Sequence, residues 1–173
     1  MQWVNRDRDE EADDSSCTFC ALPKRGDDRG TNVVARSEHV YVLLNNMPYN
    51  PGHLMVIPYD HGGKFHVLDE ATVVDCIRTA QTAIAALNDA LSPGGYNVGF
   101  NVGNAGGASI ADHLHMHVIP RWESDTSFLP LTANTAVVEE AVAETYDRVS
   151  AALLDRELAR PHPERDSVLL AGE

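Results

Sequence analysis

The hydrophobic positions between residues 33 and 58 follow the pattern of β-strands. Residues 33–36 and 39–44 are rich in the β-branched and aromatic residues that favour a pleated sheet. Two prolines and a glycine in residues 48–52 have the composition of a reversing turn. We therefore expect two strands, a turn and a further strand over residues 53–58.

A change of period then predicts a long helix. Between residues 68 and 91 the apolar side chains recur every three or four positions, as one buried helix face requires. Ser, Pro and two Gly in residues 92–95 end this helix, and residues 96–102 are expected to form the next strand. The last two expected elements are a strand over residues 113–120 and a second helix over about 136–159.

The length and composition fit one folded domain with polar ends. The chain has 173 residues, 43% of them hydrophobic, which is enough for one sizeable core. Residues 1–15 are dominated by Asp, Glu and Arg, so we expect a disordered acidic tail there. Residues 16–160 are expected to form the single domain, and residues 161–173, which contain two prolines, a loose C-terminal tail.

Charge and the lengths of apolar runs argue against several classes of function. The net charge of -13 repels phosphate polymers, so no nucleic-acid partner is expected. No apolar run approaches the roughly 20 residues that span a bilayer, and the N-terminus lacks the pattern of a secretory signal. We therefore expect a cytoplasmic protein without a membrane partner. The three cysteines do not suggest a disulfide framework.

Three histidines alternate with apolar residues in the expected strand at residues 113–120. Successive side chains of a strand point to opposite faces, so His113, His115 and His117 are expected on one face. A neutral imidazole can attack phosphorus at pH 7, and a protonated neighbour can stabilise phosphate oxygens. The small-residue loop at 103–109 can aim backbone N–H groups at an anion. The alternatives are a half-exposed strand without chemistry, or one metal bound by all three rings.

This pattern, His-x-His-x-His followed by two apolar positions, resembles the hallmark of the histidine triad (HIT) family of nucleotide hydrolases and transferases. The resemblance extends from about Cys17 to Trp122. It implies an α+β, HIT-like fold with a five-stranded antiparallel sheet and two main helices. It also implies a homodimer or higher homo-oligomer and a covalent nucleotidyl-histidine intermediate, with no organic cofactor.

The resemblance also assigns roles to individual residues. His115 takes the place of the family nucleophile, His117 would contact the α-phosphate, and His113 completes the catalytic triad. His53 matches a supporting histidine that orients the nucleophilic ring through a hydrogen-bond chain. The residues placed against substrate are Asn45 at the ribose, Asn101 near the phosphates, Gly107 and Ser109 at the phosphate oxygens, and Trp122 at the entrance. For the two asparagines, ordinary hydrogen bonding at strand ends is the alternative.

Two cysteines near the N-terminus suggest a metal site. The two-residue gap between Cys17 and Cys20 lets both thiolates reach one tetrahedral ion, and zinc then needs two further ligands, commonly histidines. In some relatives these are a histidine shortly after a strand and the first triad histidine, which correspond here to His61 and His113. Such a zinc would be structural. The alternative is two reduced cysteines that pack as small apolar residues.

Two further details bear on the reaction. One more residue separates Asn101 from the triad than in the phosphoramidase branch of the family, and Pro120-Arg121-Trp122 follows it. Both resemble the diadenosine tetraphosphate phosphorylases, which implies a dinucleoside polyphosphate substrate and inorganic phosphate to resolve the intermediate. The alternatives are hydrolysis of a dinucleoside polyphosphate or a nucleoside phosphoramidate and, in a different class, a non-catalytic nucleotide-binding partner protein.

Overall fold

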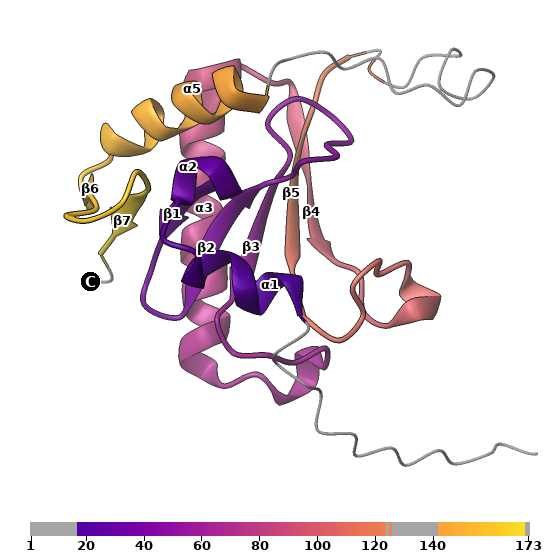
Figure 1. Cartoon of the computed structure of the whole chain (residues 1–173). Helices are drawn as coiled ribbons and strands as arrows, with labels where there is room; N and C mark the ends of the chain where they lie inside the picture. Colours follow the sequence, from indigo (N-terminus) through magenta and orange to yellow (C-terminus); the bar gives the residue numbers. More distant parts are fainter. Residues whose placement is uncertain (1–16, 124, 126–141, 172–173) are drawn as a thin grey trace, which may run out of the picture.

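The computed structural model describes residues 17–123, 125 and 142–171 (Figure 1). The acidic tail expected at residues 1–15 and the beginning of the second helix, at residues 136–141, lie outside the described residues. The described elements, in chain order, are α1 Thr18–Ala21, η2 Leu22–Lys24, α2 Asp28–Thr31, β1 Val33–Arg36, β2 Val40–Leu44, β3 Leu54–Pro58, η3 Phe65–Val67, α3 Glu70–Leu91, β4 Gly95–Phe100, η4 Asn104–Gly106, β5 Met116–Arg121, α5 Val142–Leu154, β6 Ala159–Pro161 and β7 Val168–Leu170.

A mixed sheet forms the centre of the fold, with seven strands among the described residues in the order β4-β5-β3-β2-β1-β7-β6. The first five pair antiparallel, as the resemblance implies. β7 then pairs parallel to β1 and antiparallel to β6. The α+β class is therefore confirmed, but the expectation of five antiparallel strands is wrong in the strand number and in one pairing.

The two additional strands come from the C-terminal segment, which was expected to be loose from residue 161. Val168 of β7 is 1% exposed and pairs with Ala35 of β1, so burial and backbone hydrogen bonds order this segment. Pro161 lies in the edge strand β6, a position where a missing N–H is tolerated. The expectation of a loose tail is therefore wrong for the described residues up to 171.

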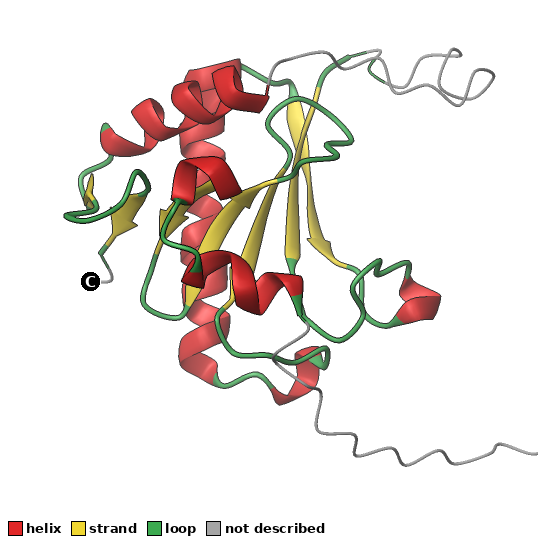
Figure 2. Ribbon diagram, in the orientation of Figure 1, coloured by secondary structure: helices red, strands yellow, loops and turns green. Residues whose placement is uncertain are grey.

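Helices and short turns cover both faces of the sheet (Figure 2). α3 and α5 pack against one face, where β2 and β3 contribute Val42, Leu44 and Val56 to the larger apolar core. The segment from α1 to α2 covers part of the other face, where Phe19 and Tyr41 belong to a smaller cluster. The sheet thus has one face buried under long helices and one face covered by the N-terminal segment.

The long helix expected between residues 68 and 91 is confirmed as α3. It begins after Asp69, whose side chain accepts a hydrogen bond from the backbone N–H of Thr72, and it ends before Ser92 in a left-handed conformation. α5 ends at Leu154 rather than near residue 159, because the chain turns there to enter β6.

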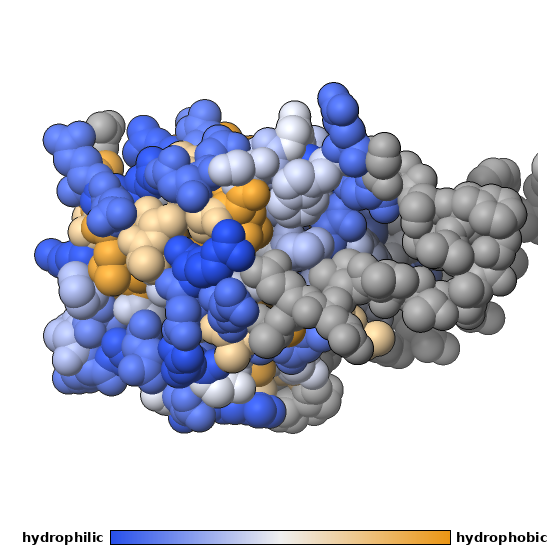
Figure 3. Space-filling view, turned by 90° about the horizontal axis from the view of Figure 1, so that it is seen from above, coloured by the Kyte–Doolittle hydropathy of each residue, from blue (hydrophilic) through white to orange (hydrophobic). Residues whose placement is uncertain are grey.

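The surface seen from above is largely hydrophilic, with small apolar areas between polar residues (Figure 3). Among the described helices, none combines the length and the apolarity that crossing a bilayer requires.

Candidate active site and metal-ligand cluster

The histidine-rich segment enters the sheet as β5, between β3 and β4. His117 pairs with Met55 of β3 and Gly99 of β4 and is half-buried, while Met116 and Val118 are buried toward α3. His113 and His115 precede β5, so the expected strand over residues 113–120 begins three residues later than predicted. The alternation of exposed and buried residues within β5 is the one expected.

His115 is held in the tautomer that a nucleophile needs. Its side chain is 2% exposed, and its Nδ1 lies 2.9 Å from the carbonyl oxygen of His113. A carbonyl oxygen can only accept, so Nδ1 carries the proton and donates it. In the neutral ring, Nε2 therefore has the free lone pair.

A chain of hydrogen bonds sets the tautomer of His117 as well. The backbone N–H of Tyr49 donates to Nδ1 of His53 over 3.2 Å, so the proton of His53 sits on Nε2. That Nε2 lies 2.9 Å from Nδ1 of His117, which must then accept. His117 consequently carries its own proton on Nε2, as a donor for an anionic oxygen.

Both rings of this chain are kept neutral. Burial, together with the nearby His117 and His115, lowers the pKa of His53 to about 4. Burial, and then the electrostatic interaction with His115, also lowers the pKa of His117. His53 was expected to orient the nucleophilic ring, but its hydrogen bond goes to His117, whose ring centroid lies 5.0 Å from that of His115.

Asn45 supports the same chain. Its Oδ1 accepts from the backbone N–H of Met47 over 3.0 Å, so its Nδ2 faces Nδ1 of His53 at 3.2 Å. Asn45 was expected at the ribose of a substrate. In the structure its side-chain contacts are with Nδ1 of His53 and the backbone N–H of Met47, and the contact with a ribose stays a prediction.

The small-residue loop after β4 lies at the end of the sheet where β5 begins. Gly107 has a φ of 85°, a left-handed conformation that favours glycine, and a Cβ there would lie 4.0 Å from Nδ2 of Asn101. Asn101 and Gly107 therefore adjoin each other, and Ser109 follows, exposed to solvent. The structure brings Asn101 and Gly107 together at the triad end of the sheet, and Ser109 lies two residues further along the same loop.

Trp122 lies at the opposite end of β5. It follows Arg121, whose carbonyl oxygen accepts from the backbone N–H of Gly94 at the start of β4. It lies seven positions after His115, which corresponds to about 23 Å in an extended chain. Its backbone N–H donates to Asp125, which also binds the guanidinium of Arg121. The structure therefore does not place Trp122 beside the triad of its own chain.

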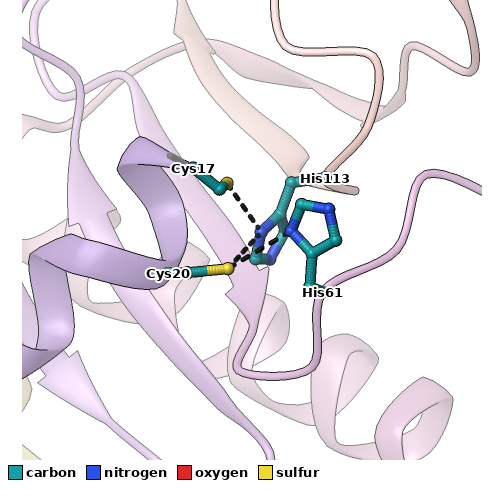
Figure 4. Close-up of side chains that lie close together, drawn as sticks. All are labelled: Cys17, Cys20, His61 and His113. Atoms are coloured by element: carbon teal, nitrogen blue, oxygen red, sulfur yellow. Dashed lines mark hydrogen bonds between the residues drawn. The ribbon is translucent and has the colours of Figure 1, made fainter. Parts of the chain in front are cut away.

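The four expected metal ligands do come together (Figure 4). The ligand atoms of Cys17, Cys20, His61 and His113 all lie within 4.8 Å of one another. Sγ of Cys20 is 3.3 Å from Nδ1 of His61 and 3.4 Å from Nδ1 of His113. Around a tetrahedral zinc ion, a sulfur and a nitrogen ligand are about 3.5 Å apart, so the four atoms fit one such ion.

The two histidines present the nitrogens that a metal would use. Nε2 of His113 lies 2.9 Å from the carbonyl oxygen of Pro58, so it carries the proton and leaves the lone pair of Nδ1 facing the thiols. His61 lies on the loop after β3, which is clamped by a 2.7 Å hydrogen bond from the backbone N–H of Leu114 to the carbonyl oxygen of Gly62. This chain therefore contains a Cys2His2 group that could bind a metal.

His113 was expected both as a catalytic residue and as a metal ligand. One ring nitrogen faces Cys17 and Cys20, and the other donates to Pro58, so its side chain belongs to the metal-ligand cluster. Its contribution to the nucleophile is the carbonyl oxygen that binds His115. His113 was expected on one face of a strand with His115 and His117, but it precedes β5 and its ring faces the two cysteines.

Two aromatic neighbours of the site were missed from the sequence. The ring of Phe19 lies 5.0 Å from that of His115, and the ring of Tyr49 stacks on His53 at 5.0 Å. Phe19 stood in the sequence only as part of the spacer between two cysteines. Tyr49 lies in the turn at residues 48–52, and its hydrogen bond to His53 comes from the backbone N–H. A backbone hydrogen bond does not depend on the type of side chain, so the sequence carries no signal of it.

Comparisons of the sequence with known proteins identify a matching family and relatives. Residues 28–124 match the model of the HIT domain. The AP-4-A phosphorylase of Mycobacterium tuberculosis is 39% identical over 127 residues, 73% of this chain and 65% of that protein, so the match spans less than two thirds of that relative. The adenosine 5'-monophosphoramidase of Schizosaccharomyces pombe is 30% identical over 61% of this chain and 74% of that protein.

Solved structures show the same fold. A Zn-bound histidine triad family protein from Mycobacterium smegmatis superposes with a TM-score of 0.66 at 26% identity, over 81% of this chain and 94% of that one. A hypothetical histidine triad nucleotide-binding protein from Sulfolobus tokodaii gives a TM-score of 0.66 at 25% identity, over 82% and 96% of the two chains.

Proposed function

The chain belongs to the HIT domain family, and from that premise we propose that it is an enzyme that transfers a nucleotidyl group from a dinucleoside polyphosphate to inorganic phosphate. The observation that carries the proposal is the hydrogen bond between Nδ1 of His115 and the carbonyl oxygen of His113. It leaves the lone pair of Nε2 of His115 as the attacking group.

In the first step, the lone pair of Nε2 of His115 forms a bond to the α-phosphorus. The bond from that phosphorus to the oxygen bridging to the β-phosphate breaks, and its electron pair leaves with the oxygen. With diadenosine tetraphosphate the leaving group is ATP, and AMP stays on His115. The positive charge of the substituted ring is stabilised by the Nδ1–H bond to the carbonyl oxygen of His113.

His117 and the loop at 103–109 bind the phosphate that reacts. The Nε2–H group of His117 donates a hydrogen bond to a phosphate oxygen, because Nδ1 of His117 already accepts from His53. Asn101, Gly107 and Ser109 supply further donors at the same end of the sheet. The largest contribution of such hydrogen-bond donors to the rate is to stabilise the negative charge that develops on the phosphate oxygens in the transition state.

In the second step, an oxygen of inorganic phosphate attacks the same phosphorus. The P–N bond breaks, its electrons return to Nε2 of His115, and ADP leaves. Phosphate rather than water is favoured because a relative 39% identical to this chain is named a phosphorylase. Water is the alternative acceptor, supported by the relative named a monophosphoramidase.

We also propose that the Cys2His2 group holds zinc. Its two thiols and two imidazole nitrogens match the usual structural zinc set, and a relative of the same fold is zinc-bound. When bound, the ion would hold the N-terminal segment against the residues that precede β5. The reaction above uses His115 and His117, and no step passes through the metal.

The products formed with and without phosphate test the proposed function. The purified chain is incubated with diadenosine tetraphosphate, and the nucleotides are separated. ADP and ATP formed only with phosphate support the transfer; AMP and ATP formed regardless of phosphate identify water as the acceptor. If the chain binds the nucleotide but forms no product, the proposed enzymatic activity is wrong, and the alternative of a non-catalytic nucleotide-binding protein is supported. A phosphoramidate in place of the dinucleotide tests the remaining alternative.

A further inference from the structure

Phe19 connects the metal-ligand cluster to the proposed nucleophile. It lies in α1 between Cys17 and Cys20, directly before the second of these ligands. Its ring makes an edge contact with His113 at a centroid distance of 5.6 Å and a tilted contact with His115 at 5.0 Å. One side chain therefore touches both a metal-ligand residue and the ring proposed to attack phosphorus.

The position of Phe19 is fixed from several sides. The hydroxyl of Tyr41, a fully buried residue of β2, donates to the carbonyl oxygen of Phe19 over 2.8 Å. Cys17 and Cys20 hold the two ends of the short helix at the ligand cluster. A four-residue helix has little stability of its own, so its placement depends on these contacts.

The imidazole of His115 needs a neighbouring side chain that fixes the tilt of its ring. The single hydrogen bond at Nδ1 of His115 fixes one atom of the ring but does not prevent the ring from tilting about it. The ring has two aromatic neighbours at 5.0 Å, Phe19 and His117. His117 is itself held by His53, so Phe19 is the neighbour whose position depends on the ligand cluster.

We propose that Phe19 is a positioning residue that orients the imidazole of His115 and makes that orientation depend on an intact metal-ligand cluster. The inference rests on the proposed function, because the orientation matters for attack on phosphorus. The ring of Phe19 packs against the rings of His113 and His115, so its effect on the reaction passes through His115. Its removal therefore slows the attack step and leaves substrate affinity nearly unchanged.

The test replaces Phe19 with Ala and with Leu, and uses Thr18→Ala as the matched control, an exposed residue of the same helix. Rapid-quench single turnover with radiolabelled diadenosine tetraphosphate measures formation of the adenylyl-enzyme. We expect Phe19→Ala to slow this step about 30-fold, as a small misplacement of a reacting group does, with KM within about twofold of the wild type. Phe19→Leu should recover most of the rate, and Thr18→Ala should behave as the wild type.

A second measurement does not depend on turnover. Spectra of ¹⁵N-histidine-labelled protein at fixed pH, without nucleotide, report whether the His115 ring is ordered with its proton on Nδ1. We expect one sharp ring signal in the wild type and in Thr18→Ala, and a broadened or mixed signal in Phe19→Ala. Zinc content from elemental analysis should be the same in all four proteins. If the wild type turns over no nucleotide, the proposed function fails, and these spectra still decide the role of Phe19.

Three results would overturn the inference. A wild-type single-turnover rate and a wild-type ring signal in Phe19→Ala would remove the positioning role. A change in KM alone would make Phe19 a substrate contact. A loss of rate explained entirely by loss of zinc would assign the effect to the metal ligands. If Phe19→Ala does not fold, Phe19→Leu decides through both measurements: a fully wild-type rate with a fully wild-type ring signal overturns the inference, and a partly reduced rate with a partly broadened signal supports it.

Discussion

The two faces of the central sheet are stabilised in different ways. The face toward α3 and α5 is stabilised by one apolar core, in which contacts do not require a particular direction. Its members include Val42, Leu44, Val56, Leu87 and Val118. On the other face, the buried groups include His53, His113 and His115, each with a specified hydrogen-bond partner. One face of the sheet therefore mainly stabilises the fold, and the other mainly holds the groups proposed to react. Apolar packing tolerates small shifts of side chains, whereas the position of a proton on an imidazole ring depends on a precise hydrogen bond.

The face of the sheet that carries His53, His113 and His115 is called the chemical face below. The largest expected effect concerns this face alone. His115→Ala removes Nε2, so we expect turnover of diadenosine tetraphosphate to fall by at least about 10⁴-fold, as loss of a nucleophile does. The apolar core on the helix face is untouched, so the melting temperature should fall by less than it does in Leu87→Ala. A steady-state assay and a thermal melt of the same sample measure both. Retained turnover would refute the assignment of His115, and Leu87→Ala is the control from the opposite face.

The next comparison sets the metal-ligand cluster against the apolar core. Cys20→Ser should lower the melting temperature by about 10 °C through loss of the metal, and a chelator should lower that of the wild type similarly. Leu87 is fully buried in the apolar core, so Leu87→Ala should cost about 3 kcal/mol through the cavity it leaves, with zinc content unchanged. Thermal melts with and without chelator, beside elemental analysis, distinguish the two. A chelator without effect would make Cys17 and Cys20 ordinary packing residues.

The chemical face should also make stability depend on pH. His53 has a folded-state pKa of about 4, below the value of about 6.5 expected in the unfolded chain. Between these values the unfolded chain binds more protons, so stability is complete above pH 6.5 and is lost as the pH falls toward 4. The loss attributable to His53 is about 3 kcal/mol. Denaturant unfolding at a series of pH values measures it, and His53→Gln should remove this part of the slope.

Most of the fold could be predicted because periodicity reports burial. The helix at α3 and the strands β1, β2 and β3 each carry a clear apolar pattern, and the structure confirms them. β6 and β7 could not be predicted, since they are three residues long and owe their place to contacts far away in the sequence. Val168 lies against β1, more than 130 residues earlier, and no local pattern announces such a pairing.

The candidate site divides in the same way. The spacing of Cys17 and Cys20 and the resemblance that named His61 and His113 identified the four members of the ligand cluster. The direction of each ring could not be predicted, because it depends on which carbonyl oxygen lies within reach. His113 turns from the reacting pair to Pro58 for that reason.

The smallest expected effect lies outside both faces, where the C-terminal hairpin meets α2. The carboxylate of Asp28 is fully buried and accepts hydrogen bonds from Arg36 over 2.6 and 2.8 Å and from the hydroxyl of Ser167 over 2.6 Å. Ser167→Ala removes one of these bonds and leaves the ion pair with Arg36. We expect a cost of about 1.5 kcal/mol, or about 4 °C in melting temperature, with an unchanged rate of nucleotidyl transfer. Thr18→Ala, which removes an exposed hydroxyl, is the control and should change stability by less than about 0.5 kcal/mol. A Ser167→Ala protein that keeps its stability but loses activity would show that this hairpin acts on the chemical face, and the separation between stability and chemistry would no longer hold.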